Sequence, residues 1–201
     1  MYIPSSWVDA HYGDLKADRP TGTGEHDYAL VQIVADFSGN SPKAPFPYLP
    51  IDSRPNIAFQ DDHVLVAGYP AEFAGGLIAQ RDLYAVTALS TIGKLFTFKN
   101  GTVDLFSIGG IIAAQGGSSG GPVVNQWGDV VGIITTTSDG TTTSARDLHA
   151  NALSYIENGI AAETGKSLSQ ILSGDIFQTT QEFSDNQAPA LIEKYLGILT
   201  N

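Results

Sequence analysis

Short apolar stretches rich in Val, Ile, Tyr, Phe and Thr recur along the first two thirds of the chain. They cover residues 28–34, 64–69, 83–89, 95–98, 103–108 and 130–137. Stretches of this length, bounded by turn residues, predict the strands of an antiparallel all-β domain. Lys99-Asn100-Gly101 is typical of a tight hairpin turn, and residues 125–129 are typical of a slightly longer one.

The pattern changes after Gly140, where we expect the chain to leave the sheet. Residues 150–162 and 167–172 have helical spacing, with Thr164-Gly165 as the break between them. A last helix is expected over residues 188–199, with its cap at Asp185-Asn186. Its apolar face packs on its own domain or offers a docking surface to a partner, and that face consists of Leu191, Ile192, Tyr195, Leu196 and Leu199.

A proline-rich loop separates two halves of the chain. Five prolines fall between residues 36 and 56, at positions 42, 45, 47, 50 and 55. Proline cannot donate to a strand ladder, and a structureless loop of this length is uncommon inside one barrel. We therefore interpret the segment as a linker between the halves.

Composition and charge exclude several classes of protein. The chain has 201 residues, enough for one domain or two small subdomains with a real core. Its formal net charge of -11 repels phosphate backbones, so we expect no nucleic-acid partner. No apolar run is long enough to span a bilayer, and the first residues do not resemble a signal peptide. The absence of cysteine and of a His-Glu-x-x-His motif predicts neither a metal site nor a cofactor.

The candidate chemistry lies in a glycine-dense turn, residues 116–121, that runs directly into a predicted strand. Acyl transfer needs a hydroxyl on a tight bend, with backbone N–H groups converging where the oxyanion forms. Ser119 supplies the hydroxyl here, and Gly117 and Ser119 supply the N–H groups. Two alternatives are a flexible Gly/Ser loop and the nucleophile elbow of α/β-hydrolases. The elbow needs a helix after the serine, and Pro122 followed by a β-run argues against one.

Ser119 in its setting, Gly-x-Ser-Gly-Gly-Pro followed by residues 128–133, resembles the trypsin-like (chymotrypsin-fold) serine peptidases, in particular their bacterial branch. Residues 27–31, Asp-Tyr-Ala-Leu-Val, are similar to the pattern around that family's triad aspartate. The resemblance implies Ser119 as nucleophile, Asp27 as the carboxylate that orients a histidine, and the N–H groups of Gly117 and Ser119 as oxyanion hole. It implies a polypeptide substrate and no cofactor.

The same resemblance implies an all-β fold, a double antiparallel β-barrel with C-terminal helices. Residues 1–40 are then the remainder of the first barrel and residues 41–60 the linker. Residues 61–150 form the second barrel with the nucleophile, and residues 151–201 a helical extension. Bacterial members of the family often work outside the cytoplasm, so an extracytoplasmic location is expected. Nothing in the pattern indicates an oligomeric state.

None of the four histidines of the chain fits the position of the family's catalytic histidine. His26 adjoins Asp27 and points to the opposite side of an extended chain. His11 is superficially similar to the family's histidine motif, but too few residues separate it from Asp27 for the intervening strands, and His63 and His149 are interpreted as structural.

A barrel needs about six strands, so we expect an incomplete first barrel with residues 3–8 as one of its later strands. The histidine is expected upstream of Met1, in a longer peptidase. The alternative is a pseudoprotease, complete as written, that binds peptides without cleaving them.

Substrate selection follows from the resemblance as well. Ala113 and Ala114 correspond to the floor of the primary specificity pocket. Thr135, Thr136 and Thr137 correspond to the strand that pairs with substrate backbone. The floor carries no carboxylate that would select Lys or Arg. A β-branched Thr137 narrows the pocket mouth, so small or medium apolar side chains are expected.

Overall fold

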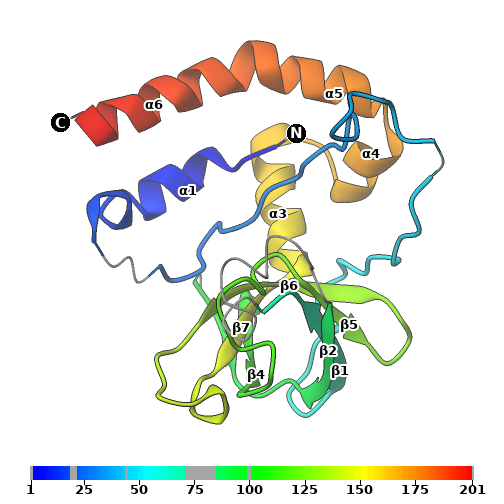
Figure 1. Ribbon diagram of the computed structural model, residues 1–201, viewed down its shortest axis with the longest axis vertical. Helices are drawn as coiled ribbons and strands as arrows, with labels where there is room; N and C mark the ends of the chain where they lie inside the picture. The colour runs from blue at the N-terminus through cyan, green and yellow to red at the C-terminus, as the bar shows by residue number, and fades with distance from the viewer. Residues whose placement is uncertain (1, 19–21, 44, 71–84, 99–100, 201) are drawn as a thin grey trace. The chain divides into compact units, whose positions relative to one another are not determined.

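The computed structural model describes residues 2–18, 22–43, 45–70, 85–98 and 101–200 (Figure 1). The chain divides into two compact units. A sheet unit comprises Thr23–Glu25 and Leu49–Asn158, and a helical unit comprises Met1–Gly22, His26–Tyr48 and Gly159–Asn201. Helix α3 (Leu153–Thr164) contains the boundary at its middle.

The sheet unit is built on one seven-stranded sheet of strand order β2-β1-β5-β6-β7-β4-β3. Its strands are β1 (His63–Gly68), β2 (Val86–Thr91), β3 (Leu95–Phe96), β4 (Leu105–Gly109), β5 (Pro122–Asn125), β6 (Val130–Thr137) and β7 (Leu148–Ala152). Every ladder between these strands is antiparallel. The prediction of an antiparallel β domain followed by C-terminal helices is confirmed. Residues 83–84 of the predicted strand 83–89 and residues 99–100 of the predicted hairpin turn lie outside the described residues.

The strands form where the sequence alternates or is continuously apolar. In β1 the side chains of Val64 and Val66 are buried, while Leu65 between them is partly exposed. Strand β6 lies between β5 and β7 and is buried along most of its length. At Gly132 in β6, a Cβ would lie 2.6 Å from Cζ of the buried Phe106, so glycine makes room for this ring.

The helical unit has its own apolar core. Its helices are α1 (Ser5–Ala10), α4 (Leu168–Ser173), α5 (Ile176–Glu182), α6 (Ala188–Thr200) and the end of α3. Val8, Phe183, Leu191 and Ile198 form the buried cluster. The helices predicted over residues 150–162, 167–172 and 188–199 correspond to α3, α4 and α6, and Gly165 (φ 70°) ends α3. None of the helices in the described part of the chain combines the length and hydropathy that a bilayer crossing demands.

The N-terminal segment is helical where a strand was expected. The prediction of a strand over residues 3–8 is wrong, because Ser5–Ala10 form α1. The carboxylate of Glu163 accepts hydrogen bonds from the first N–H groups of this helix, those of Ser5 (3.2 Å) and Ser6 (3.3 Å). In the predicted strand 28–34, only Leu30 pairs, in an isolated bridge with Tyr2.

Two predictions for the second half are also wrong. The chain does not leave the sheet at Gly140, because Leu148–Ala152 return as β7 between β6 and β4. Asp185 and Asn186 do not cap the last helix. They lie in a π-helical turn, Phe183–Gln187, that connects α5 directly to α6.

Candidate active site

Ser119 lies in the sheet unit, on the glycine turn that directly precedes β5. Two glycines of this turn have left-handed backbones, Gly117 with φ 96° and Gly120 with φ 85°. The side chain of Ser119 is exposed, and its Oγ donates a hydrogen bond of 3.1 Å to the carbonyl oxygen of Thr135 in β6. The turn therefore presents one hydroxyl at the surface in a defined direction.

Neighbouring strands hold the turn in place. Gly120 N–H donates to the carbonyl of Ile134 (2.8 Å), and Ile134 N–H donates to the carbonyl of Gly121 (2.9 Å). A Cβ on Gly121 would lie 2.1 Å from the carbonyl oxygen of Ala67 in β1. Only glycine allows this approach of the turn to β1, so the position of Ser119 depends on it.

The amide groups of the turn leave two donors for a ligand. Ser118 N–H donates to the carbonyl of Gln115 (3.3 Å), and Gly121 N–H donates to the carbonyl of Ser118 (3.0 Å). Within the described ranges, no residue accepts a hydrogen bond from the N–H of Gly117 or of Ser119. These are the two donors that an oxyanion hole on this turn requires.

The predicted substrate-binding residues lie in the same unit as the turn. Ala113 and Ala114 are fully buried. The ladder between β5 and β6 ends at Pro122 paired with Ile133, while β7 pairs with the opposite edge of β6 as far as Thr137. On the side of β6 that pairs with β5, residues 135–137 therefore extend beyond the end of the β5–β6 ladder.

The three threonines at the end of β6 differ in their surroundings. The side chain of Thr135 is buried, and those of Thr136 and Thr137 are partly exposed. A Cβ on Gly24 would lie 3.1 Å from Cγ2 of Thr135 and 3.3 Å from Cγ2 of Thr136. Gly24 of the same chain therefore already lies against Thr135 and Thr136. Pairing of Thr136 with substrate backbone stays a prediction.

The buried side chain of Asn151 holds the segment Thr23–Glu25 in place in the sheet unit. Asn151 in β7 is fully buried, and its Nδ2 donates a hydrogen bond of 2.9 Å to the carbonyl of Gly24. Sequence reasoning missed this contact, because 127 residues separate the two partners. The local sequence offers one hint of this turn, the glycine at position 24, whose backbone is left-handed in the structure (φ 85°).

The sheet unit thus contains most of the predicted site residues. Ser119 and Gly117 lie with the two alanines and the three threonines in the sheet unit. Asp27 is exposed, follows Gly24 by three residues in the sequence, and belongs to the helical unit.

Two of the histidines, His11 and His149, contact side chains other than Ser119. His11 is buried in the helical unit, where its Nδ1 lies 3.1 Å from Asp14 Oδ2 and its ring lies 5.1 Å from the Trp7 ring. In the sheet unit, His63 begins β1, and His149 packs edge-on against Phe96 with ring centroids 5.5 Å apart. Burial lowers the pKa of His149. Neither His63 nor His149 is hydrogen-bonded to Ser119, whose hydroxyl bonds to Thr135.

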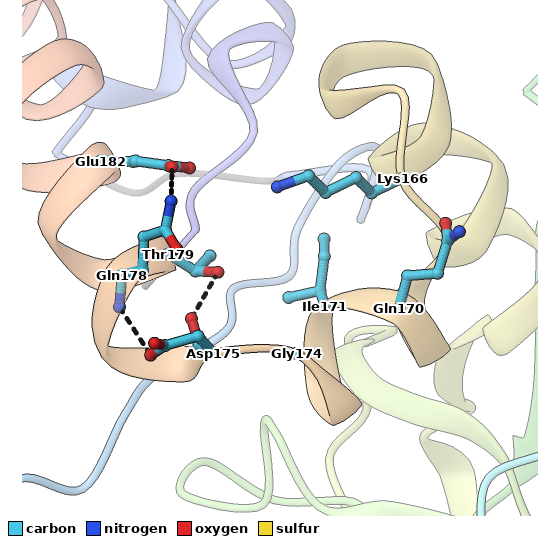
Figure 2. Close-up of a pocket in the computed structure, with 8 residues that line it drawn as sticks. All are labelled: Lys166, Gln170, Ile171, Gly174, Asp175, Gln178, Thr179 and Glu182. Carbon is cyan, nitrogen blue, oxygen red and sulfur yellow. Dashed lines mark hydrogen bonds between the residues drawn. The ribbon is translucent and has the colours of Figure 1, made fainter.

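The helical unit contains a polar pocket of about 250 Å³ between α4 and α5 (Figure 2). Asp175 caps α5 by accepting a hydrogen bond from Gln178 N–H (3.0 Å), and Gln178 Nε2 donates to Glu182 (2.9 Å). These polar groups of α5 hydrogen-bond within the helix and its cap, and Gln170 Oε1 accepts a hydrogen bond from Ser167 N–H (2.8 Å) at the start of α4. The described residues also contain no group of three potential metal ligands.

The family model of the trypsin-like peptidase domain matches residues 4–133. Among solved structures, Rv3671c from M. tuberculosis, in the inactive form of an alanine mutant, has a TM-score of 0.43 and 19% identity over 63% of this chain and 59% of that one. Kallikrein-related peptidase 10 has a TM-score of 0.40 and 18% identity over 58% and 56%.

The HtrA-type protease AlgW, with a decapeptide, has a TM-score of 0.40 and 19% identity over 60% of this chain and 34% of that one. This chain therefore spans 59% of the length of Rv3671c. No curated protein matches the sequence.

Proposed function

The chain belongs to the trypsin-like peptidase domain family, and on that premise we propose that it is a serine endopeptidase that cleaves polypeptides through an acyl-enzyme on Ser119. The observation that carries the proposal is the exposed Ser119 hydroxyl on its glycine turn, oriented by the Thr135 carbonyl. The two amide donors of Gly117 and Ser119 support it.

The chemistry assigned to these groups is acyl transfer in two steps. Ser119 Oγ attacks the scissile carbonyl carbon while a base removes its proton, and the N–H groups of Gly117 and Ser119 stabilise the oxyanion. The intermediate collapses, the C–N bond breaks, and the leaving amine takes up the proton. Water then hydrolyses the ester and restores the hydroxyl. Asp27 has the proposed role of orienting the imidazole that carries the proton.

The base of this mechanism is proposed to be a histidine other than His11, His63 and His149. His11 is held by Asp14 and Trp7 in the helical unit, and the other two lie on strands without a bond to Ser119. His26, directly before Asp27, has a left-handed backbone (φ 55°). The chain is therefore not extended at His26, and the expectation that its side chain points to the opposite side from that of Asp27 does not hold there.

The substrate is proposed to add a short strand along Thr135, Thr136 and Thr137. An extended peptide beside a strand edge gains backbone hydrogen bonds at regular spacing, and this holds its scissile bond in place. The uncharged floor at Ala113 and Ala114 supports selection against lysine and arginine.

A second candidate function is peptide binding without cleavage. The observation that favours it is the hydrogen bond from Ser119 Oγ to the Thr135 carbonyl, since an activated serine donates to an imidazole. Such a module would use the same strand edge and the same floor.

Hydrolysis of fluorescently labelled casein distinguishes the two functions. We expect the protein isolated from its native source to release peptides, and S119A to lose this activity by at least about 10³-fold. Ser173→Ala is the matched control, because Ser173 lies on α4 and donates to the Ser169 carbonyl (2.7 Å). Equal hydrolysis by S119A refutes the peptidase proposal, and peptide binding without hydrolysis supports the second candidate.

A further inference from the structure

Lys166 and Glu182 line the same pocket between α4 and α5, within the helical unit. Lys166 directly precedes the cap of α4, and Glu182 is the last residue of α5. Both also line a neighbouring pocket of about 210 Å³. Figure 2 shows the Lys166 side chain extending across the pocket toward the end of α5 that carries Glu182. A positive and a negative group therefore border one hollow from different helices.

Neither charge is neutralised within the part of the chain that the structure describes. Lys166 Nζ makes no ion pair and no hydrogen bond there. Glu182 Oε1 accepts one hydrogen bond, from the neutral Gln178 Nε2 (2.9 Å), and Oε2 accepts none. The ammonium group can therefore donate to an anionic group of a ligand, and the carboxylate can accept from a cationic one.

The rest of the lining is either hydrogen-bonded already or apolar. Asp175 Oδ1 accepts from Gln178 N–H, and Thr179 Oγ1 donates to the Asp175 carbonyl (3.0 Å). Ile171 is buried and lines both pockets, so it adds an apolar surface beside the two charges. A matching ligand has a positive group, a negative group and an apolar part.

We propose that this pocket binds a free α-amino acid with an apolar side chain. The carboxylate of the ligand accepts from Lys166, its ammonium group donates to Glu182, and its side chain lies against Ile171. A ligand with a single charge leaves one of the two protein charges without a partner. The pocket of about 250 Å³ is large enough, since a cavity of about 150 Å³ holds a benzene molecule.

The charge of the whole chain favours a zwitterion over a simple anion. A formal net charge of -11 repels small anions at long range. A free amino acid has no net charge and approaches without this repulsion. Because Lys166 and Glu182 are both exposed, each contact is weak, and we expect a Kd in the millimolar range.

This inference goes beyond the proposed function and does not depend on it. The pocket is built from residues of Gly159–Asn201, whereas Ser119 belongs to the sheet unit. S119A is therefore expected to bind the amino acid as the wild type does. The test contains no hydrolysis step, so its failure leaves the peptidase proposal intact, and an inactive Ser119 leaves this inference intact.

The test is a titration of the full, ¹⁵N-labelled chain followed by amide chemical shifts at about pH 6, where amino groups are protonated and carboxylates ionised. The probes are leucine, leucinamide, N-acetyl-leucine and glycine. Leucinamide lacks the negative charge, N-acetyl-leucine lacks the positive one, and glycine lacks the side chain. We expect leucine to shift the amides around Lys166, Ile171 and Glu182, and to bind at least about threefold more tightly than each other probe.

Two variants assign each charge of the ligand to its partner. Lys166→Gln should abolish the preference for leucine over leucinamide and keep the preference over N-acetyl-leucine. Glu182→Gln should do the reverse. Lys43→Gln and Glu193→Gln are the matched controls, because both residues are exposed, belong to the helical unit and do not line the pocket. They should leave all the ratios unchanged.

The wild-type titrations decide the question even if a variant does not fold. Equal binding of leucine and any one of the other three probes overturns the inference. Absence of leucine binding, or shifts confined to residues away from the pocket, overturns it as well. A loss of both preferences in Lys43→Gln or Glu193→Gln would show that total charge, and not the pocket, selects the ligand.

Discussion

Gly121→Ala tests whether the position of the Ser119 turn depends on the close approach to β1. The added Cβ would lie 2.1 Å from the Ala67 carbonyl oxygen, 2.9 Å from the Ser118 carbonyl oxygen and 3.0 Å from Ile134 Cδ1. A normal contact with the Ala67 oxygen needs a separation larger by about 1 Å. Ala67 belongs to β1, which pairs with β2 on one side and β5 on the other. Because the clash is with backbone, no rotamer change relieves it.

The expected loss is at the upper end of overpacking effects, about 3 kcal/mol in the free energy of unfolding. We expect a lower urea midpoint by far-UV circular dichroism and faster hydrogen exchange of the β1 and β5 amides. Gly197→Ala in α6 is the matched control, because its Cβ would meet nothing within 4 Å. It should stabilise the protein by about 0.5–1 kcal/mol. A loss below about 1 kcal/mol for Gly121→Ala refutes the argument that this approach fixes the turn.

Three further substitutions have defined outcomes. Burial raises the pKa of Glu163, but hydrogen bonds from the hydroxyls of Ser6 and Tyr2 and from two N–H groups lower it overall. Its contribution is therefore present above the unfolded pKa of about 4.3 and is lost as pH falls through the lower folded value. Glu163→Gln should cost up to about 1 kcal/mol at pH 7, since the carboxylate is exposed, and less at pH 3. Urea curves with equal deficits at both pH values contradict this. Asn151→Ala leaves the Gly24 carbonyl without its donor and should cost about 1–3 kcal/mol, with faster hydrogen exchange near residues 23–25; unchanged exchange there contradicts the anchoring role. Phe106→Ala should cost about 3–5 kcal/mol in urea denaturation, because its ring is fully buried against Gly132, and a loss below about 1 kcal/mol contradicts that core contact.

The sheet could be predicted where the strands themselves are apolar and β-branched, as in β1 and β6. Strand β7 could not, because its sequence Leu-His-Ala-Asn-Ala has little β propensity. It becomes a strand through pairing with β6 and β4 on both sides, and its buried Asn151 has a distant partner in Gly24. Likewise α1 is a short helix whose first N–H groups are bonded by Glu163, more than 150 residues away.

The candidate site likewise has a part that could be predicted from the sequence and a part that depends on tertiary contacts. The Ser119 turn is a local structure, so its glycines, the proposed nucleophile and the two proposed oxyanion donors could be predicted from adjacent residues. The contacts of Arg146 with Ala114 and of Gly24 with Thr135 and Thr136 join residues far apart in the sequence, so they depend on the tertiary fold. No spacing rule connects them to Ser119.

Covalent labelling of Ser119 tests the central claim most directly. The protein from its native source is incubated with a fluorophosphonate, and the modified residue is identified by peptide mapping with mass spectrometry. An activated serine displaces fluoride and becomes phosphonylated, whereas an ordinary surface serine does not react. We expect a single adduct on Ser119 that S119A abolishes. An unmodified Ser119, or equal labelling of wild type and S119A, would contradict the peptidase proposal.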